Sequence, residues 1–230
     1  MNAAGESRPR ARPNAIRWRP HRLEKMIDRV RCRAWFQGKD FTSDWSSGNF
    51  TMWRRVLSPL KQEPLRILEI GSWEGRSALF FLNYFKRSTI VCIDTFEGTP
   101  EEKAIYDQFA SVIGGVEGRF DRNLSPFAGR VEKIKSRSGP ALDGLAAQRR
   151  RFDLAYIDGS HRRDEVMRDS VGVWQLITIG GVVIWDDYEW GLDLPPEQQP
   201  RPAINDFLRD HQGQYRLLAT TYQIAVERVN

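Results

Sequence analysis

The sequence has little cysteine and no long hydrophobic run. Only two of its 230 residues are cysteines, Cys32 and Cys92, and they form neither a CxxC pair nor a cluster with histidine. This spacing favours neither a disulfide framework nor a zinc site. No apolar run approaches the roughly 20 residues that span a bilayer, and the N-terminus lacks the apolar segment of a secretory signal. We therefore expect a cytoplasmic protein without membrane contact.

The net positive charge of the chain comes from its N-terminal end. The net charge is +5, but residues 1–40 hold nine Arg and two Lys against four acidic residues, so residues 41–230 have a net charge of −2. Residues 1–21 are rich in Arg, Pro and Ala and poor in large apolar side chains, which predicts a flexible basic arm. Such an arm could bind the phosphates of nucleic acid or acidic lipid. The acidic balance of the remainder disfavours nucleic acid as the partner.

From about residue 65, short β-like runs alternate with amphipathic helical stretches. This alternation is typical of a parallel sheet covered on both faces. The predicted strands are 65–70, 89–94, 130–134, 152–157, 181–186, 215–221 and 222–229, and the predicted helices are 76–86, 101–124, 140–150, 161–177 and 202–211. The last two strands are joined tightly, so the final one should run antiparallel.

The pattern predicts an α/β, Rossmann-like fold with a seven-stranded, mostly parallel sheet. Residues 22–60 contain six large aromatic side chains between residues 35 and 53 and are expected to form a small N-terminal helical cap. Residues 61–230 then form the main domain. The cap aromatics and the loop at 189–202 are candidate walls for a substrate, although ordinary packing would explain them equally well.

The segment ILEIGSWEGRSA, residues 67–78, joins the first strand to a helix through a glycine turn. Gly71 and Gly75 permit a tight turn, but the lysine of a phosphate-binding GxxxxGK[ST] loop is absent. Carboxylates at Glu69 and Glu74 suggest instead a ligand with a cationic group, such as an amino acid ammonium. The residues predicted to bind it are Glu69, Gly71, Ser72, Glu74, Gly75 and Ser77.

Two later segments complete this predicted ligand. Asp94, followed by Thr95, ends the second strand in CIDTFEG, where a carboxylate can accept both hydroxyls of a ribose. Ser138, in KSRSGPAL after the third strand, is placed to line an adenine pocket. Ammonium, ribose and adenine sites together describe S-adenosylmethionine. An NAD enzyme would have similar spacing, but the YxxxK pair of the short-chain dehydrogenases is absent.

Three carboxylates are expected beside the donor. Asp158 follows the fourth strand in YIDGSH, and Asp186 and Asp187 follow the fifth in VVIWDDYEW. Because like charges repel at short range, a cation should lie among them, and oxygen ligands favour Mg²⁺, with Mn²⁺ as a substitute. His161 has a side chain suited to a general base near neutral pH. The alternatives are capping roles for the aspartates and a surface position for His161.

The motifs LEIGSWEGRSA, CIDTFEG, YIDGSH and IWDDYEW, followed by RPAINDFL and YQIAVERV, resemble those of the class I S-adenosylmethionine-dependent methyltransferases. The resemblance is narrower to the metal-dependent O-methyltransferases of bacterial natural-product pathways, of the macrocin, mycinamicin and aminocoumarin-sugar type. It covers residues 40–230 and implies Mg²⁺-dependent methylation of a vicinal diol, sugar or catechol-like hydroxyl. Such relatives often form dimers or larger rings, which makes a homo-oligomer a further expectation.

The resemblance also assigns roles to residues. It gives Glu69, Gly71 and Gly75 the methionine end of the donor, Asp94 the ribose and Ser138 the adenine side, and it places Asp158 among both the donor-binding and the catalytic residues. The metal ligands would be Asp158, Asp186 and Asp187, and His161 would be the base. Sugar-modifying members have an Asp in place of this histidine.

Three rival functions can be weighed against this resemblance. An N-methyltransferase commonly has an Asn/Asp-Pro-Pro-aromatic motif where this chain has IDGS. A nucleic-acid methyltransferase could use the basic arm, but it needs a basic platform on the domain itself. A non-catalytic donor-binding partner protein is the third alternative, and the retention of all three aspartates argues against it.

Overall fold

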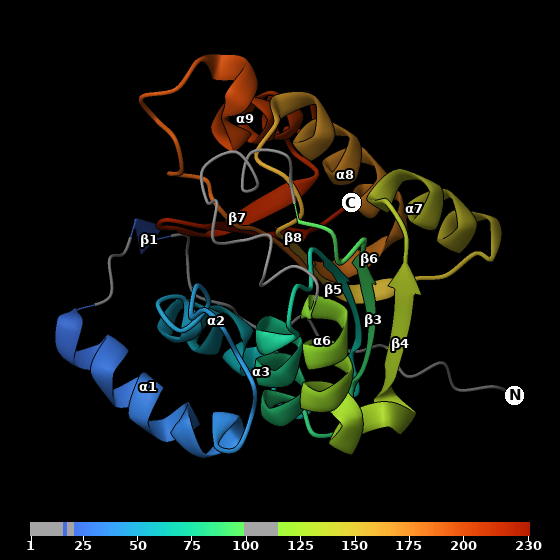
Figure 1. Ribbon diagram of the computed structural model, residues 1–230. Helices are drawn as coiled ribbons and strands as arrows, with labels where there is room; N and C mark the ends of the chain where they lie inside the picture. Colours follow the sequence, from blue (N-terminus) through green and yellow to red (C-terminus); the bar gives the residue numbers. More distant parts are fainter. Residues whose placement is uncertain (1–15, 18–20, 99–114) are drawn as a thin grey trace, which may run out of the picture.

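The computed structural model describes residues 16–17, 21–98 and 115–230. A single sheet runs through the molecule, with strand order β1-β7-β8-β6-β5-β2-β3-β4. Helices cover both of its faces (Figure 1). The α/β, Rossmann-like fold expected from the sequence is therefore confirmed. The predicted arm falls largely on residues 1–15 and 18–20, which lie outside the described residues.

The sheet contains the seven predicted strands and one more. They are β1 (Ile16–Arg17), β2 (Arg66–Ile70), β3 (Thr89–Asp94), β4 (Val131–Lys135), β5 (Phe152–Ile157), β6 (Ile177–Trp185), β7 (Tyr215–Thr220) and β8 (Ile224–Arg228). β8 lies between β6 and β7 and is antiparallel to both, whereas the other neighbours pair in parallel. The expected reversal of the last strand is thus present.

The chain changes direction across the sheet at β2. From β2 it proceeds outward to β3 and β4, and it then returns to β5 on the other side of β2. In open α/β sheets, ligands bind at such a switch point, outside the carboxyl ends of the strands. The functional residues should therefore be sought where β2 and β5 end.

Two layers of helices enclose the sheet, and each covers one hydrophobic cluster. The first layer holds α1 (Arg22–Phe36), α2 (Phe50–Leu57), η1 (Ser58–Leu60), α3 (Arg76–Tyr84), α6 (Val116–Leu124) and η2 (Ser125–Arg130). The second holds α7 (Ser138–Ala147), α8 (Arg163–Leu176), η3 (Pro196–Gln198) and α9 (Pro200–Asp210). Within β2, Ile67 belongs to the first cluster and Leu68 to the second, because successive strand residues face opposite sides.

The cap is part of this core. Trp53 of α2 is fully buried and packs against Phe81 and Tyr156, with ring centroids 4.9 and 5.1 Å apart. Phe50 stacks on Phe80 at 4.6 Å. These aromatics therefore pack into the domain, and of the candidate substrate walls in the cap only Trp45 is largely exposed, at 55%.

Most of the predicted helix 101–124 lies outside the described residues, and α6 forms its end. Two strands differ from the sequence prediction. The two-residue strand β1 adds to the edge at β7, where Ile16 pairs with Ala219. It lies in the arm, and its short, Arg-rich surroundings give no strand pattern. β6 starts at Ile177, ahead of the predicted residue 181, because the pairing with β5 shifts register after Phe152 and Gly180 adopts a φ of +81°. Within the described part of the chain, no helix has the length and apolar character needed to cross a membrane.

Candidate functional site

The glycine turn after β2 lies directly against the end of β5. Gly71 has a φ of +82°, and a Cβ at this position would be 1.9 Å from the carbonyl oxygen of Asp158. Its N–H donates to the carbonyl of Ile93 at the end of β3, at 2.9 Å. Only glycine can adopt this conformation with the Asp158 carbonyl so close to its Cα. The predicted donor turn and the first carboxylate of the predicted metal cluster are therefore adjacent.

Glu69 lies on β2, beneath the turn, and is fully buried. Burial raises its pKa to about 7, and the hydroxyls of Ser77 and Ser72 oppose that rise. The Sγ of Cys92 lies 3.5 Å from Oε2. A cationic ligand beside Glu69 would favour its ionised form, which suits the predicted ammonium contact. Ser72 and Ser77, also predicted, lie next to this carboxylate.

Asp94 ties the tip of the turn to the loop that follows β3. Its Oδ2 accepts a hydrogen bond from the N–H of Trp73 at 2.7 Å, and Oδ1 accepts from that of Phe96 at 2.6 Å. Both donors belong to residues with positive φ, 47° and 58°. Thr95 Oγ1 accepts from the N–H of Glu97 at 3.3 Å. Asp94 thus holds the glycine turn against the loop after β3, and its contact with a ribose stays a prediction.

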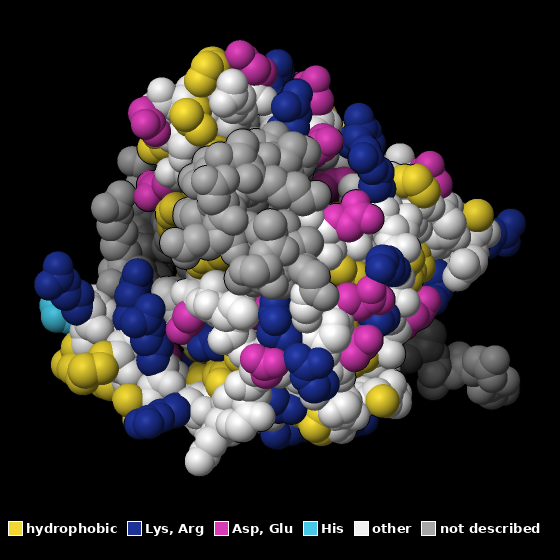
Figure 2. Space-filling view, in the orientation of Figure 1, with side chains coloured by type: hydrophobic (Ala, Val, Ile, Leu, Met, Phe, Trp, Pro, Cys, Tyr) yellow, Lys and Arg dark blue, Asp and Glu magenta, His cyan; other side chains and the backbone are white. Residues whose placement is uncertain are grey.

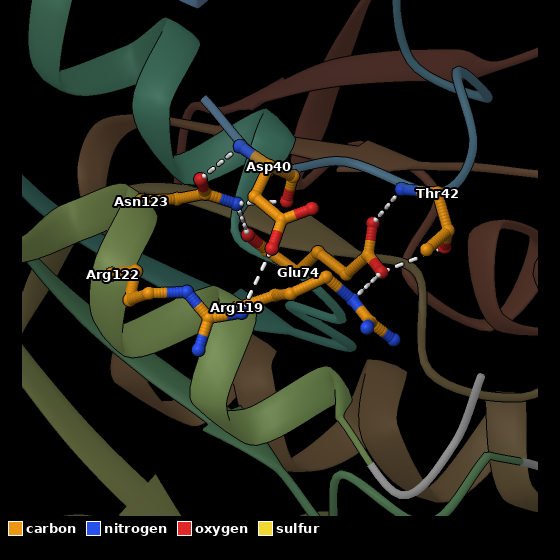
Figure 3. A network of polar contacts seen from close by, with 6 residues as sticks. All are labelled: Asp40, Thr42, Glu74, Arg119, Arg122 and Asn123. Atoms are coloured by element: carbon orange, nitrogen blue, oxygen red, sulfur yellow. Dashed lines mark hydrogen bonds and ion pairs between the residues drawn. The ribbon is translucent and has the colours of Figure 1, made fainter. Parts of the chain in front are cut away.

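Glu74 has a different environment from the one predicted. It is 1% exposed, and its oxygens accept hydrogen bonds from the N–H and the hydroxyl of Thr42, both at 2.7 Å, and pair with Arg119. Asn123 of α6 adds a bond to the Glu74 carbonyl at 3.0 Å and two bonds to the backbone of Asp40 (Figure 3). These contacts link the cap and α6 to the turn, so Glu74 holds the turn from within the protein.

Ser138 begins α7, and its hydroxyl lies near the carboxylate of Asp169 in α8. Asp169 is 2% exposed, and burial raises its pKa to about 6, a rise that the Ser138 hydroxyl opposes. Gly159 lies close by, since a Cβ on it would be 3.6 Å from Oδ2 of Asp169. Asp169 therefore supports Ser138 and the loop after β5. The sequence analysis did not predict a role for Asp169, although an acidic residue among the apolar residues of EVMRDSVGVW indicates a buried carboxylate.

The carboxylates of Asp158 and Asp186 share one tyrosine hydroxyl. β5 and β6 pair in parallel, with Ile157 opposite Trp185, so the residues after them emerge at one edge. The Tyr156 hydroxyl donates to Asp158 at 3.0 Å and also contacts Asp186. Burial and the neighbouring aspartates raise the pKa of Asp158 well above its usual value and that of Asp186 to about 7.

Asp187 connects this pair to His161. Its Oδ2 lies 2.9 Å from His161 Nε2, and its Oδ1 accepts a hydrogen bond from Tyr222 at 2.7 Å. Asp187 has a φ of 55°, a strained conformation of the kind found at functional sites. The ring of Trp190 stacks on His161 with centroids 4.1 Å apart. Since α8 begins at Arg163, His161 lies in the preceding loop and not in the helix predicted from residue 161.

Tyr156 and Tyr222 were absent from the sequence prediction, and Trp190 was included only as part of the candidate substrate wall at 189–202. Tyr156 precedes Asp158 by two residues on one strand and therefore shares its face, a signal that the sequence does contain. Tyr222 approaches from the turn between β7 and β8. Its contact depends on the position of β8 beside β6, which local sequence does not specify.

The three aspartate carboxylates are suitable ligands for a hard divalent cation, although their oxygens have protein partners here. Burial first, and then the repulsion among the three carboxylates, raises the pKa of Asp158 and Asp186, and a cation would relieve the repulsion. Across residues 16–17, 21–98 and 115–230, no group of three His, Cys, Asp or Glu is arranged to hold a metal ion. A metal would have to take oxygens now bonded to Tyr156, Tyr222 and His161.

Two proteins are similar in sequence. The uncharacterized protein R132 of Acanthamoeba polyphaga mimivirus is 26% identical over 176 residues, which cover 73% of this chain and 70% of that protein. The O-methyltransferase hkm8 of Aspergillus hancockii is 30% identical over 131 residues, 56% of this chain and 44% of the fungal protein. This chain therefore corresponds to less than half of the fungal enzyme.

Solved structures share the fold. The MycE methyltransferase of the mycinamycin biosynthetic pathway, in complex with Mg, SAH and mycinamycin VI, aligns with a TM-score of 0.59 and 16% identity over 86% of this chain and 52% of MycE. The O-methyltransferase NovP aligns with a TM-score of 0.56 and 16% identity over 76% of this chain and 75% of NovP. Residues 68–188, more than half of the chain, match the family model described as a methyltransferase domain. The protein belongs to the methyltransferase domain family.

Proposed function

We propose that this protein is an S-adenosylmethionine-dependent O-methyltransferase that modifies a hydroxyl of a small molecule with the help of Mg²⁺. One observation carries the proposal: the backbone of Gly71 lies against that of Asp158. The donor turn and the three carboxylates thereby belong to one site at the switch point of the sheet. Such a site can hold a methyl donor and an acceptor hydroxyl side by side.

In the donor half, the turn from Gly71 to Gly75 would hold the methionine end, with Glu69 as the partner of its ammonium. Asp94 would accept the ribose hydroxyls, and Ser138, supported by Asp169, would line the adenine pocket. S-adenosylmethionine supplies an electrophilic methyl group when bound. Ionised Glu69 is disfavoured by burial without a ligand, so donor binding should be accompanied by proton release from Glu69.

In the acceptor half, Asp158, Asp186 and Asp187 would hold Mg²⁺, which lowers the pKa of a bound hydroxyl and fixes its direction. Because a carboxylate only accepts hydrogen bonds, His161 Nε2–H would donate to Asp187, 2.9 Å away, and Nδ1 would take the proton that the acceptor hydroxyl loses. Asp187 would then stabilise the imidazolium. Mg²⁺ held there would favour an acceptor with two adjacent oxygens, such as a vicinal diol, a sugar or a catechol-like ring.

A role in natural-product biosynthesis is the biological setting that we propose for this activity. It is supported by the sequence motifs and by the fold shared with MycE, which was solved with mycinamycin VI. The acceptor would then be a hydroxylated small molecule, with the cytoplasm as the compartment and a homo-oligomer as the working state.

The test is methyl transfer to a panel of vicinal diols, sugars and catechols. We expect S-adenosylhomocysteine to form only with an acceptor and Mg²⁺, and to fall at least about a hundredfold in H161A and D186N. D143N, which changes an exposed aspartate of α7, is the matched control and should retain activity. Transfer that survives both EDTA and D186N, or that requires nucleic acid, would contradict the proposal.

A further inference from the structure

The solvent-facing side of α1 carries a stripe of apolar side chains. Leu23, Met26, Ile27 and Val30 are 53%, 56%, 39% and 67% exposed. Their spacing of three and four residues places them on one face of the helix. Cys32, on the opposite face, is fully buried in the core. The stripe is therefore not part of the core packing of α1, and an exposed row of this kind marks a contact surface.

Cationic side chains border this stripe. At 100° per residue, Arg22, Arg29 and Arg33 lie along one edge and Arg31 along the other. All four are exposed. Figure 2 shows hydrophobic side chains beside Lys and Arg at the lower left, over the region of α1. With five cationic and two acidic residues, α1 has a net charge of +3.

We propose that α1 binds the surface of an anionic lipid bilayer. Charge complementarity selects this partner, because pairing two copies of the stripe would bring two helices of net charge +3 together. Residues 1–21 add five Arg and one Glu directly before the helix, whereas residues 41–230 are slightly acidic. An amphipathic helix next to a polybasic segment supplies the two signals that stable peripheral binding requires.

The helix would lie in the plane of the interface. Its stripe would enter the boundary between headgroups and acyl chains, and the Arg side chains would extend to the lipid phosphates. Such peripheral binding does not require a membrane-spanning segment. It departs from the sequence expectation only in that the expectation excluded any membrane contact. It is also independent of the catalytic proposal, because α1 contributes no residue to the site described above.

The experiment is flotation of the full-length protein with vesicles in 0.1 M NaCl. Phosphatidylcholine vesicles are compared with vesicles in which about 30% of the lipid is phosphatidylglycerol. We expect binding to the anionic vesicles only, and a loss of about tenfold or more in M26E/V30E, which places two charges in the stripe. V171E/I179E introduces the same charges at exposed apolar positions outside α1 and should bind like the wild type.

A second variant, R29E/R33E, leaves the stripe intact and should lose binding to a similar degree because two cations at the interface are reversed. Circular dichroism and the unfolding midpoint establish that each variant folds. Equal binding of wild type and M26E/V30E would overturn the proposal by leaving only the arm in contact with lipid. Absence of wild-type binding would also overturn it, as would a dimer that M26E/V30E converts to a monomer.

Discussion

At the residue scale, Gly71 is the position on which the site depends most directly. A methyl group there would meet the Asp158 carbonyl at 1.9 Å, in a backbone conformation with a φ of +82°. We expect G71A to lose about 2 kcal/mol or more of folding stability, measured by urea unfolding, and to lose donor binding. G144A is the control, since a Cβ on Gly144 in α7 meets nothing within 4 Å. Equal stability of the two variants would contradict this description of the turn.

Glu69 should make stability depend on pH. Burial raises its pKa from 4.5 to about 7, so the folded state binds more protons than the unfolded state between these values. Without ligand, this contribution to stability is fully present below about pH 4.5 and is lost as the pH rises to about 7, by up to about 3 kcal/mol. E69Q should therefore have a flatter profile and exceed the wild type at pH 8. Parallel profiles of the two proteins would show that Glu69 does not titrate in this range.

Trp190 should position the base that we propose. Its ring stacks on His161 at 4.1 Å, so removing it frees the imidazole to rotate. W190A is expected to reduce kcat about tenfold with little change in the KM for donor, and W190F should recover most of the loss because it keeps an aromatic face. A change confined to the acceptor KM would instead make Trp190 a substrate wall.

At the scale of elements, strand boundaries were predictable because both faces of the sheet are buried. TIVCID and FDLAYI were placed correctly to the residue as β3 and β5, since continuous apolar runs end where polar site residues begin. β1 could not be predicted, because its two residues are held by pairing with β7 and not by their own pattern. Strand positions of this kind are set by contacts between distant parts of the chain.

The candidate site, too, could be predicted from the sequence only where local residues specify it. Glycines and strand-terminal aspartates can be recognised in the sequence, because a tight turn requires glycine and a polar ligand requires a carboxylate at the strand end. Glu74 looked the same in the sequence as Glu69, but its partners Thr42 and Arg119 lie 32 and 45 residues away along the chain. Tyr222 and Asp187, which are 35 residues apart, likewise meet only after β8 inserts into the sheet.

The Glu74 network yields a test at this scale. E74A removes the carboxylate that pairs with the mostly buried Arg119, together with both bonds to Thr42. We expect a loss of about 2–4 kcal/mol of stability in the absence of any ligand, with donor affinity reduced mainly through the loosened turn. Equilibrium unfolding and donor titration separate the two effects. If E74A lost donor affinity but kept its stability, the result would instead support the direct contact between Glu74 and the donor that the sequence predicts.

At the scale of the whole molecule, the topology brings the glycine turn after β2 and the carboxylates after β5 and β6 to one place. The chain leaves β2 for β3 and β4 and returns to β5 beside β2, so the donor turn and the carboxylates meet although 87 residues separate Gly71 from Asp158. The excess of positive charge lies elsewhere, on the N-terminal segment and α1. Catalysis and surface attachment can therefore be tested separately.

We propose that one site of this protein holds both a methyl donor and a metal. The most direct test is the unfolding midpoint of the full-length protein with S-adenosylmethionine, with and without Mg²⁺, and with NAD as the control. A donor at about a hundred times its dissociation constant should add roughly 2.7 kcal/mol, or several degrees. We predict this shift, a further one with Mg²⁺ that D186N abolishes and D143N keeps, and none with NAD. A shift with NAD alone, or no shift with the donor, would contradict the account.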